Sequence, residues 1–146
     1  MSSAREEQFK NAIQSAAQAF GRQERRSDYL ALYDSNAVIY DTPAGMLKGI
    51  EAITQFYNGF WAAFPDARLE LGNIIAEGDK VACTFSATGT HTGSAFNGIP
   101  ASGKPIRITG VTILRFLDSG KCIERWNGSD TLPLLQQLGA IPPPAH

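Results

Sequence analysis

The chain has 146 residues, of which 43% are hydrophobic and 18% are charged, and its formal net charge is -1. This length suits one domain with one core, and this composition is typical of a folded protein rather than a disordered one. Lysine and arginine are scattered, with Arg25-Arg26 as the one basic pair of note. The charge pattern therefore argues against a surface that follows nucleic-acid phosphates.

The N-terminal segment and the cysteines predict a cytoplasmic protein. The first ten residues lack the apolar stretch of a secretory signal. No apolar run approaches the roughly 20 residues that span a bilayer, so we expect no membrane partner. Cys83 and Cys122 match no zinc or redox spacing and are expected to be reduced residues of the core or sheet.

The first half of the chain predicts helices. Large and small apolar residues recur at helical spacing from Phe9 to Phe20 and indicate an amphipathic helix over residues 4–22. Ser27 can cap a short helix that runs through Tyr33. A short strand over residues 37–41 then precedes a third helix, rich in aromatic residues, over residues 50–64.

The second half predicts an antiparallel sheet. Residues 68–76 and 80–91 flank the turn Glu77-Gly78-Asp79, and residues 106–117 and 121–130 flank Asp118-Ser119-Gly120. A glycine-rich connection over residues 92–105 joins the two hairpins. Helices followed by long strands favour an α+β domain in which helices cover one face of a curved antiparallel sheet. We expect a single domain over residues 1–146, with a proline-rich tail over residues 142–146.

A series of short segments carries a resemblance to a known family. In chain order they are residues 32–41, 64–66, 76–81, 89–93, 96–104, 115–116, 124–126, 130 and 137–139. Over residues 27–141 the chain resembles the SnoaL-like polyketide cyclases, also called ester cyclases, of the nuclear transport factor 2-like superfamily. The resemblance implies a cone-shaped curved sheet packed on three N-terminal helices, with a pocket in the wide end. It also implies a homodimer through the outer face of the sheet.

The resemblance assigns faces to the strand residues. It places inside the cone Asp41, Thr112, Trp126, Gly128 and Asp130. Side-chain alternation adds Phe85, together with residues 81, 83 and 87, to the inner face. Alternation puts Val111 and Ile113 outward, and an uncovered apolar pair favours a dimer interface. The same reasoning leaves Arg107 and Arg125 pointing outward.

Asp41 is the first candidate for a catalytic acid or base. The ketosteroid isomerases of the same superfamily carry their proton-shuttling carboxylate at the end of this strand, just before a proline, as in Asp41-Thr42-Pro43. A carboxylate on an apolar wall has its pKa raised toward the range useful for proton transfer. The alternative is that Asp41 caps the following turn.

His91 and Asp130 are the other catalytic candidates. His91 ends the segment Gly89-Thr90-His91-Thr92-Gly93, and an imidazole can act as acid, base or hydrogen-bond donor near neutral pH. The alternative is a structural histidine bonded to the backbone of the glycine-rich loop. Asp130 could act as an acid or base at the pocket floor or could cap a helix over residues 132–138.

Five side chains are candidates for substrate binding: Trp126, Thr112, Tyr57, Trp61 and Phe85. Aromatic residues at helical spacing are more often core than binding site, but in a cone the inner face of the helix serves as both.

The known catalytic sets of the superfamily are incomplete here. Anthracycline-type cyclases use a histidine and an aspartate at positions that match Thr112 and Gly128. The oxyanion carboxylate of the isomerases also falls on Thr112, and their catalytic tyrosine has no match near Ala17 or Phe20. The Asp-Arg-Asp relay of limonene-type epoxide hydrolases is not apparent.

We expect neither a metal nor a cofactor. The sequence has no histidine pair with metal-ligand spacing and no glycine-rich phosphate cradle. The preferred hypothesis is a cofactor-independent cyclase or isomerase that moves a proton beside a carbonyl of a hydrophobic substrate, with His91 or Thr112 donating to the enolate. The alternatives are an epoxide or ester hydrolase and a non-enzymatic dimeric domain that binds small molecules.

Overall fold

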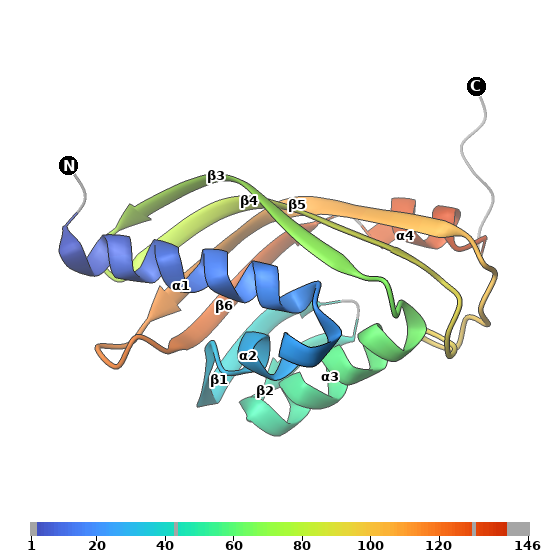
Figure 1. The fold of residues 1–146 in the computed structure, drawn as a ribbon, viewed down its shortest axis with the longest axis horizontal. Coiled ribbons are helices and arrows are strands. Elements are labelled where there is room, and N and C mark those ends of the chain that lie inside the picture. Colours follow the sequence, from blue (N-terminus) through green and yellow to red (C-terminus); the bar gives the residue numbers. More distant parts are fainter. Residues whose placement is uncertain (1–2, 43, 130, 140–146) are drawn as a thin grey trace.

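The computed structural model describes residues 3–42, 44–129 and 131–139 (Figure 1). Its elements in chain order are α1 (Ala4–Phe20), a 3₁₀ turn (Gln23–Arg25), α2 (Arg26–Leu30), β1 (Tyr33–Thr42), β2 (Gly45–Lys48), α3 (Gly49–Ala63), β3 (Arg68–Glu77), β4 (Lys80–Thr90), β5 (Pro105–Phe116), β6 (Cys122–Ser129) and α4 (Thr131–Gln137).

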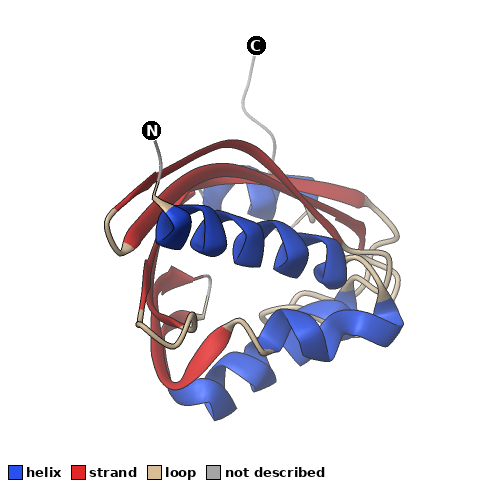
Figure 2. Ribbon diagram, turned by 60° about the vertical axis from the view of Figure 1, so that its left-hand side comes forward, coloured by secondary structure: helices blue, strands red, loops and turns tan. Residues whose placement is uncertain are grey.

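One six-stranded sheet organises the molecule. Its strand order is β2-β1-β6-β5-β4-β3, and every neighbouring pair is antiparallel except β1 and β6, which are parallel. The sheet is curled, α1 crosses its concave side, and α3 lies beneath the same side (Figures 1 and 2). The predicted α+β cone with three N-terminal helices is therefore confirmed, and the described residues add the C-terminal helix α4.

Helix α1 is defined by its cap and its buried stripe. The Ser3 hydroxyl accepts from the backbone of Glu6 at 3.1 Å, while the Glu6 carboxylate accepts from the Ser3 backbone at 2.6 Å, which forms a capping box. Phe9 and Phe20 lie on the stripe that faces the sheet, and the Phe9 ring stacks on Phe116 of β5 at 4.6 Å. The amphipathic helix predicted over residues 4–22 is confirmed.

Helix α3 carries the aromatic centre of the core. Tyr57, Phe60 and Trp61 are buried along it. The Phe20 ring of α1 meets all three of these rings, at centroid distances of 6.1, 6.0 and 5.3 Å respectively. Because large rings at helical spacing face one side, α3 packs that side inward and bounds the interior from below the sheet.

Three local features differ from the sequence prediction. Strand β2 was not predicted, β1 begins at Tyr33 rather than residue 37, and α2 begins at Arg26 instead of being capped by Ser27. Strand β2 has only four residues and is held by pairing with β1 through Val38–Lys48 and Ile39–Leu47. A strand of four residues gives no periodic signal in the sequence, because apolar and polar side chains alternate too few times along it.

A bulge in β6 inverts the predicted faces of this strand. Phe116 is the Cα partner of Cys122, but Arg115 pairs with Glu124, so β6 holds one extra residue at this point. Alternation continued from Cys122 would turn Trp126 inward, whereas the extra residue turns Arg125 inward instead. The predicted inward placement of Trp126 and Gly128 and the outward placement of Arg125 are wrong for this reason.

The faces of β4 and β5 follow the prediction. Val81, Cys83 and Ala87 are buried on β4, and Thr112 is buried on β5. Val111 and Ile113 point outward on β5, where they are 50% and 40% exposed. These two strands pair without interruption from Lys80–Arg115 to Thr90–Pro105, so strict alternation holds along both.

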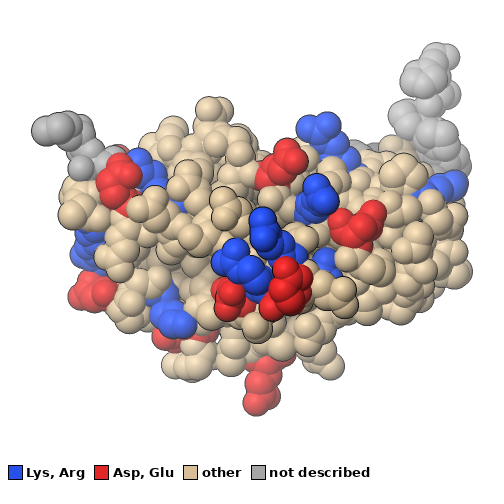
Figure 3. Space-filling view, viewed as in Figure 1, with Lys and Arg blue, Asp and Glu red and all other residues tan. Residues whose placement is uncertain are grey.

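The surface seen in Figure 3 carries charges of both signs interspersed with uncharged residues. Among the described residues, no helix combines the length and the apolar character needed to cross a membrane.

Candidate active site

A cavity of about 90 Å³ lies between the concave face of the sheet and helices α1, α2 and α3. Apolar side chains make most of its wall, and the exposed residues Asp41 and Ser129 mark its mouth. Its lining residues are Phe20, Tyr29, Asp41, Thr42, Phe56, Tyr57, Phe60, Leu69, Phe85, Ala87, Ile108, Arg125, Asn127 and Ser129. An apolar chamber with a few polar groups is the usual form of a small-molecule site.

Arg125 is the charged centre of this cavity. Its side chain is 7% exposed. Its Nε donates to the Thr112 hydroxyl at 2.9 Å, and its Nη1 donates to the hydroxyls of Tyr33, Tyr29 and Tyr57 at 2.7, 2.9 and 3.3 Å. Nη2 makes no hydrogen bond with any residue that the structure describes. The guanidinium is thus held rigidly on one side and is left with donors for a cavity occupant.

The surroundings of this cluster determine which of its side chains are charged. Desolvation raises the pKa of Tyr29 and of Tyr33 well above the usual value, so both phenols are neutral near pH 7. Burial alone would lower the pKa of Arg125, but the surrounding tyrosine hydroxyls outweigh it and hold that pKa well above its usual value. The cavity therefore contains a permanent cation and, in its inner part, no anion among the described residues.

Asp41 supplies a carboxylate at the mouth. Its backbone has a φ of 59°, in the left-handed region that aspartate adopts more readily than most residues. This conformation lies in the irregular stretch of β1 between Ile39 and Thr42, and Asp41 lines the cavity. The turn that follows is held by Thr42, whose hydroxyl donates to Gly45 O at 2.5 Å and accepts from Ala44 N at 3.1 Å. Thr42, rather than Asp41, performs the turn-capping role.

Asn127 adds a second polar group beside Arg125. Its amide nitrogen donates to the Tyr40 carbonyl at 3.4 Å, while its Oδ1 is buried with no hydrogen-bond partner among the described residues. A buried acceptor without a partner is costly, and this one belongs to a residue of the cavity wall.

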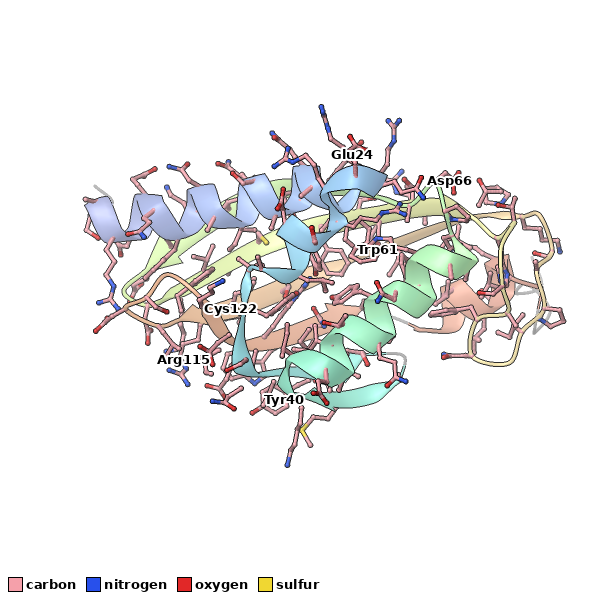
Figure 4. All side chains as sticks on the ribbon, turned by 60° about the horizontal axis from the view of Figure 1, so that its bottom comes forward. Glu24, Tyr40, Trp61, Asp66, Arg115 and Cys122 are labelled. Carbon is pink, nitrogen blue, oxygen red and sulfur yellow. The ribbon has the colours of Figure 1, made fainter. Side chains whose placement is uncertain are left out.

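The predicted substrate-binding residues separate into two groups. Tyr57 and Phe85 line the cavity. Trp61 is not among the residues that line the cavity; it lies between α3 and α1 (Figure 4), and its ring meets those of Phe20 and Tyr29. Thr112 is 2% exposed and lies behind Arg125. The Thr112 hydroxyl already accepts from Arg125 and donates to Trp126 O at 2.9 Å, so it has no proton left for a substrate oxygen.

His91 is not part of the cavity wall. It is fully buried at the end of β4, its Nε2 lies 2.9 Å from Ser94 O, and its ring packs on Phe64 at 4.9 Å. Its backbone pairs with Lys104 and Gly103 across the glycine-rich connection. This geometry matches the alternative prediction of a structural histidine.

Trp126 lies on the outer side of the sheet, where its ring stacks on Tyr40 at 5.5 Å. Its Cα partner on β5 is the outward Ile113. Asp130 and the predicted tail over residues 142–146 lie outside the described residues.

Sequence reasoning missed Arg125, Tyr29 and Asn127 as site residues. Three of the four tyrosines of the chain gather around Arg125, from α2, β1 and α3. The sequence already showed Arg125 as a charged residue of a predicted strand, but alternation without the bulge placed it outside. Within residues 3–42, 44–129 and 131–139, no cluster of three or more histidine, cysteine or acidic residues could hold a metal ion.

Comparison with known proteins agrees with the fold. Over residues 10–138 the chain matches the family model for SnoaL-like polyketide cyclase. No curated protein shows significant sequence similarity to the chain.

Several solved structures share the architecture. AclR, a candidate hydroxylase from Streptomyces galilaeus, is 28% identical with a TM-score of 0.81, over 96% of this chain and 86% of AclR. IdmH, a candidate polyketide cyclase from Streptomyces antibioticus, is 29% identical with a TM-score of 0.72, over 90% of this chain and 99% of IdmH. A candidate SnoaL-like polyketide cyclase from Jannaschia sp. CCS1 is 22% identical and shows the fold alone, with a TM-score of 0.84 over 97% and 99% of the two chains. Since the family model spans most of the sequence, this chain belongs to the SnoaL-like polyketide cyclase family.

Proposed function

We propose that this protein is a cofactor-independent enzyme that cyclises or isomerises a hydrophobic carbonyl compound by acid–base chemistry in the cavity. One observation carries the proposal: a buried cation, Arg125, and a carboxylate, Asp41, line the same apolar chamber. A fixed positive charge in a dry site stabilises an enolate far better than water does.

Each residue has a distinct role in the proposed reaction. The Asp41 carboxylate removes a proton from the carbon beside the carbonyl, and the carbonyl oxygen becomes an enolate. Tyr57 donates a hydrogen bond from its hydroxyl to that oxygen, while the Arg125 guanidinium behind it balances the new charge. In a cyclisation, the enolate carbon then attacks a second carbonyl, and the alkoxide that forms takes the proton from Asp41. In an isomerisation, the proton returns from Asp41 to another carbon.

The strand register supports this separation of roles. Ile39 is the Cα partner of Arg125, and Asp41 lies two residues further along β1. Asp41 and Tyr57 both line the cavity. A substrate in the cavity can therefore present its carbonyl oxygen to Tyr57 and the adjacent carbon to Asp41.

The test follows proton exchange rather than a natural product. A 1,3-diketone with an aryl group is incubated with the protein in D₂O, and deuterium entry at the central carbon is followed by NMR. Replacing Asp41 with Asn keeps the left-handed backbone conformation accessible, and we expect a loss of about 10²- to 10⁴-fold in the catalysed exchange. Asp79→Asn, in the turn between β3 and β4, is the matched control and should retain full exchange.

Two outcomes would replace this proposal. Solvent oxygen incorporated into an epoxide or ester substrate would indicate a hydrolase in which Asp41 activates water. Unchanged exchange in Asp41→Asn would remove Asp41 as the base, and ligand binding with no catalysed exchange would indicate a binding domain.

We also infer a homodimer through the outer face of the sheet. Val111 and Ile113 present apolar surface there, 50% and 40% exposed, and exposed apolar patches are typical of interfaces. The extent of the domain, residues 1–146, and its location in the cytoplasm stay predictions.

A further inference from the structure

Arg125 differs from the other arginines in its setting. Arg5, Arg25 and Arg115 form ion pairs with Asp118, Asp28 and Glu124 near the surface. Arg125 is buried, and no described carboxylate lies within ion-pair distance of it. A buried charge without a counter-ion is costly, and such charges are normally paired.

The tyrosines around Arg125 do not supply the missing anion. All three hydroxyls accept hydrogen bonds from Nη1, and the Tyr29 and Tyr33 hydroxyls lie 2.7 Å apart, which requires one of them to donate its proton to the other. Desolvation keeps Tyr29 and Tyr33 neutral. These groups disperse the charge of Arg125 but do not neutralise it.

The geometry leaves one side of the guanidinium for a ligand. Nε and Nη1 are used within the protein, whereas Nη2 bonds to no described residue and Arg125 lines the cavity. The Phe85 ring lies 6.0 Å from the guanidinium carbon, and the rings of Phe20, Phe56 and Phe60 also line the chamber. A planar body with one acidic group complements this surface.

We propose that the cavity binds its substrate as an anion, with a carboxylate or phenolate oxygen on Nη2 of Arg125, beside the carbonyl that Tyr57 holds. The substrate class is therefore a flat apolar β-keto acid or a 2-hydroxyaryl ketone. Asp41 at the mouth repels a second negative charge, so the outer end of the substrate is neutral. This inference rests on the proposed use of the cavity as the substrate site.

Paired probes test the charge of the ligand without requiring turnover. Benzoate and benzamide have nearly the same shape but differ in charge, and their binding is measured by calorimetry at constant ionic strength. We expect benzoate to bind at least about tenfold more tightly than benzamide. A second arm uses 4-nitrophenol, whose ionised form is yellow; binding as phenolate lowers its apparent pKa in the complex. A preference for benzoate over benzamide would indicate a carboxylate on Arg125. A lowered pKa of bound 4-nitrophenol would indicate a phenolate.

Variants connect the preference to Arg125. Arg125→Gln should abolish the preference for benzoate, and Arg107→Gln, an exposed arginine of β5, should keep it. Because Arg125→Gln removes a buried network and could unfold the chain, Tyr57→Phe serves as the second variant and should weaken benzoate about fivefold. Asp41→Asn should bind benzoate at least as well as the unmodified protein.

The outcomes separate this inference from the proposed function. If benzamide binds as tightly as benzoate while Asp41→Asn still loses proton exchange, the anionic substrate is wrong and the acid–base function stands. If benzoate is preferred while Asp41→Asn exchanges normally, the anion site stands and Asp41 is not the base. A preference for benzoate that survives Arg125→Gln would overturn the assignment to Arg125.

Discussion

At the scale of single residues, the main feature is a cation buried among phenols. Tyr29, Tyr33 and Tyr57 accept from one guanidinium nitrogen, and Thr112 accepts from another. Removing one partner from such a network leaves buried polar atoms unpaired, which costs more than the bond itself contributes. The cluster is therefore both part of the core and the polar centre of the cavity.

The same cluster of tyrosines predicts that the folded protein loses stability at alkaline pH. The pKa of Tyr29 and that of Tyr33 are raised in the folded protein above the ordinary value of 10.0. The unfolded chain then releases protons first, so the stability from these groups is fully present below pH 10 and falls as pH rises above it. Once that pH is passed, each buried tyrosine should remove about 1.4 kcal/mol of unfolding free energy per pH unit.

Urea unfolding between about pH 8 and about pH 11 measures this slope, and tyrosinate absorbance shows when each phenol ionises. Tyr33→Phe should reduce the slope, while Tyr40→Phe, outside the cluster, should change it less, because the hydrogen bond with Glu124 raises the pKa of Tyr40 less than burial raises that of Tyr33. Ionisation of all the tyrosines in protein that is still folded would contradict the prediction.

At the scale of elements, the glycine-rich connection holds α3 in place. Gly93 N donates to Ala63 O at 3.1 Å, and Ser94 N donates to Ala62 O at 3.0 Å, so the connection closes the C-terminal end of α3. A Cβ at Gly93 would lie 1.7 Å from Ala62 O. The connection can approach the helix this closely only with glycine at this position.

Gly93→Ala should therefore destabilise the fold by about 1–3 kcal/mol, because the connection must move away from α3. Gly59→Ala is the matched control: it lies on α3 with no atom within 4 Å of the added Cβ and should stabilise the protein by about 0.5–1 kcal/mol. Thermal or urea unfolding of both variants measures the difference. Equal stability for Gly93→Ala and the unmodified protein would show that the close contact does not hold the helix.

At the scale of the whole molecule, the curled sheet has two faces with different tasks. The concave face and helices α1, α2 and α3 enclose the cavity, while the outer face carries Val111 and Ile113. Exposed apolar side chains on a long pair of strands are usually buried against another surface. For this reason we infer a dimer.

Ile113→Glu should convert the inferred dimer into a monomer, because it places a charge in the apolar contact. Sedimentation equilibrium measures the molecular mass over a range of concentrations. Met46→Glu is the control, since Met46 is 51% exposed on β2 at the edge of the sheet and should leave the dimer intact. An unmodified protein that sediments as a monomer throughout would exclude this interface.

The sequence by itself determined the helices and strands that patterns of neighbouring residues predict. Helical spacing from Phe9 to Phe20 predicted α1, and the turns at Gly78 and Gly120 located both hairpins. Uninterrupted pairing of β4 with β5 made simple alternation sufficient, so Thr112 was correctly placed on the inner face and Ile113 on the outer face. Periodicity reports such features because each depends on neighbours within a few residues.

The tertiary structure alone decided the polar centre of the cavity. One extra residue in β6 exchanged Trp126 for Arg125 on the inner face, and no local pattern marks such a bulge. The tyrosines that hold Arg125 come from three elements far apart in the chain, and His91 turned away from the cavity into its own loop. The charge that defines the candidate site therefore depends on strand register and long-range packing, which emerge only when the whole sheet has formed.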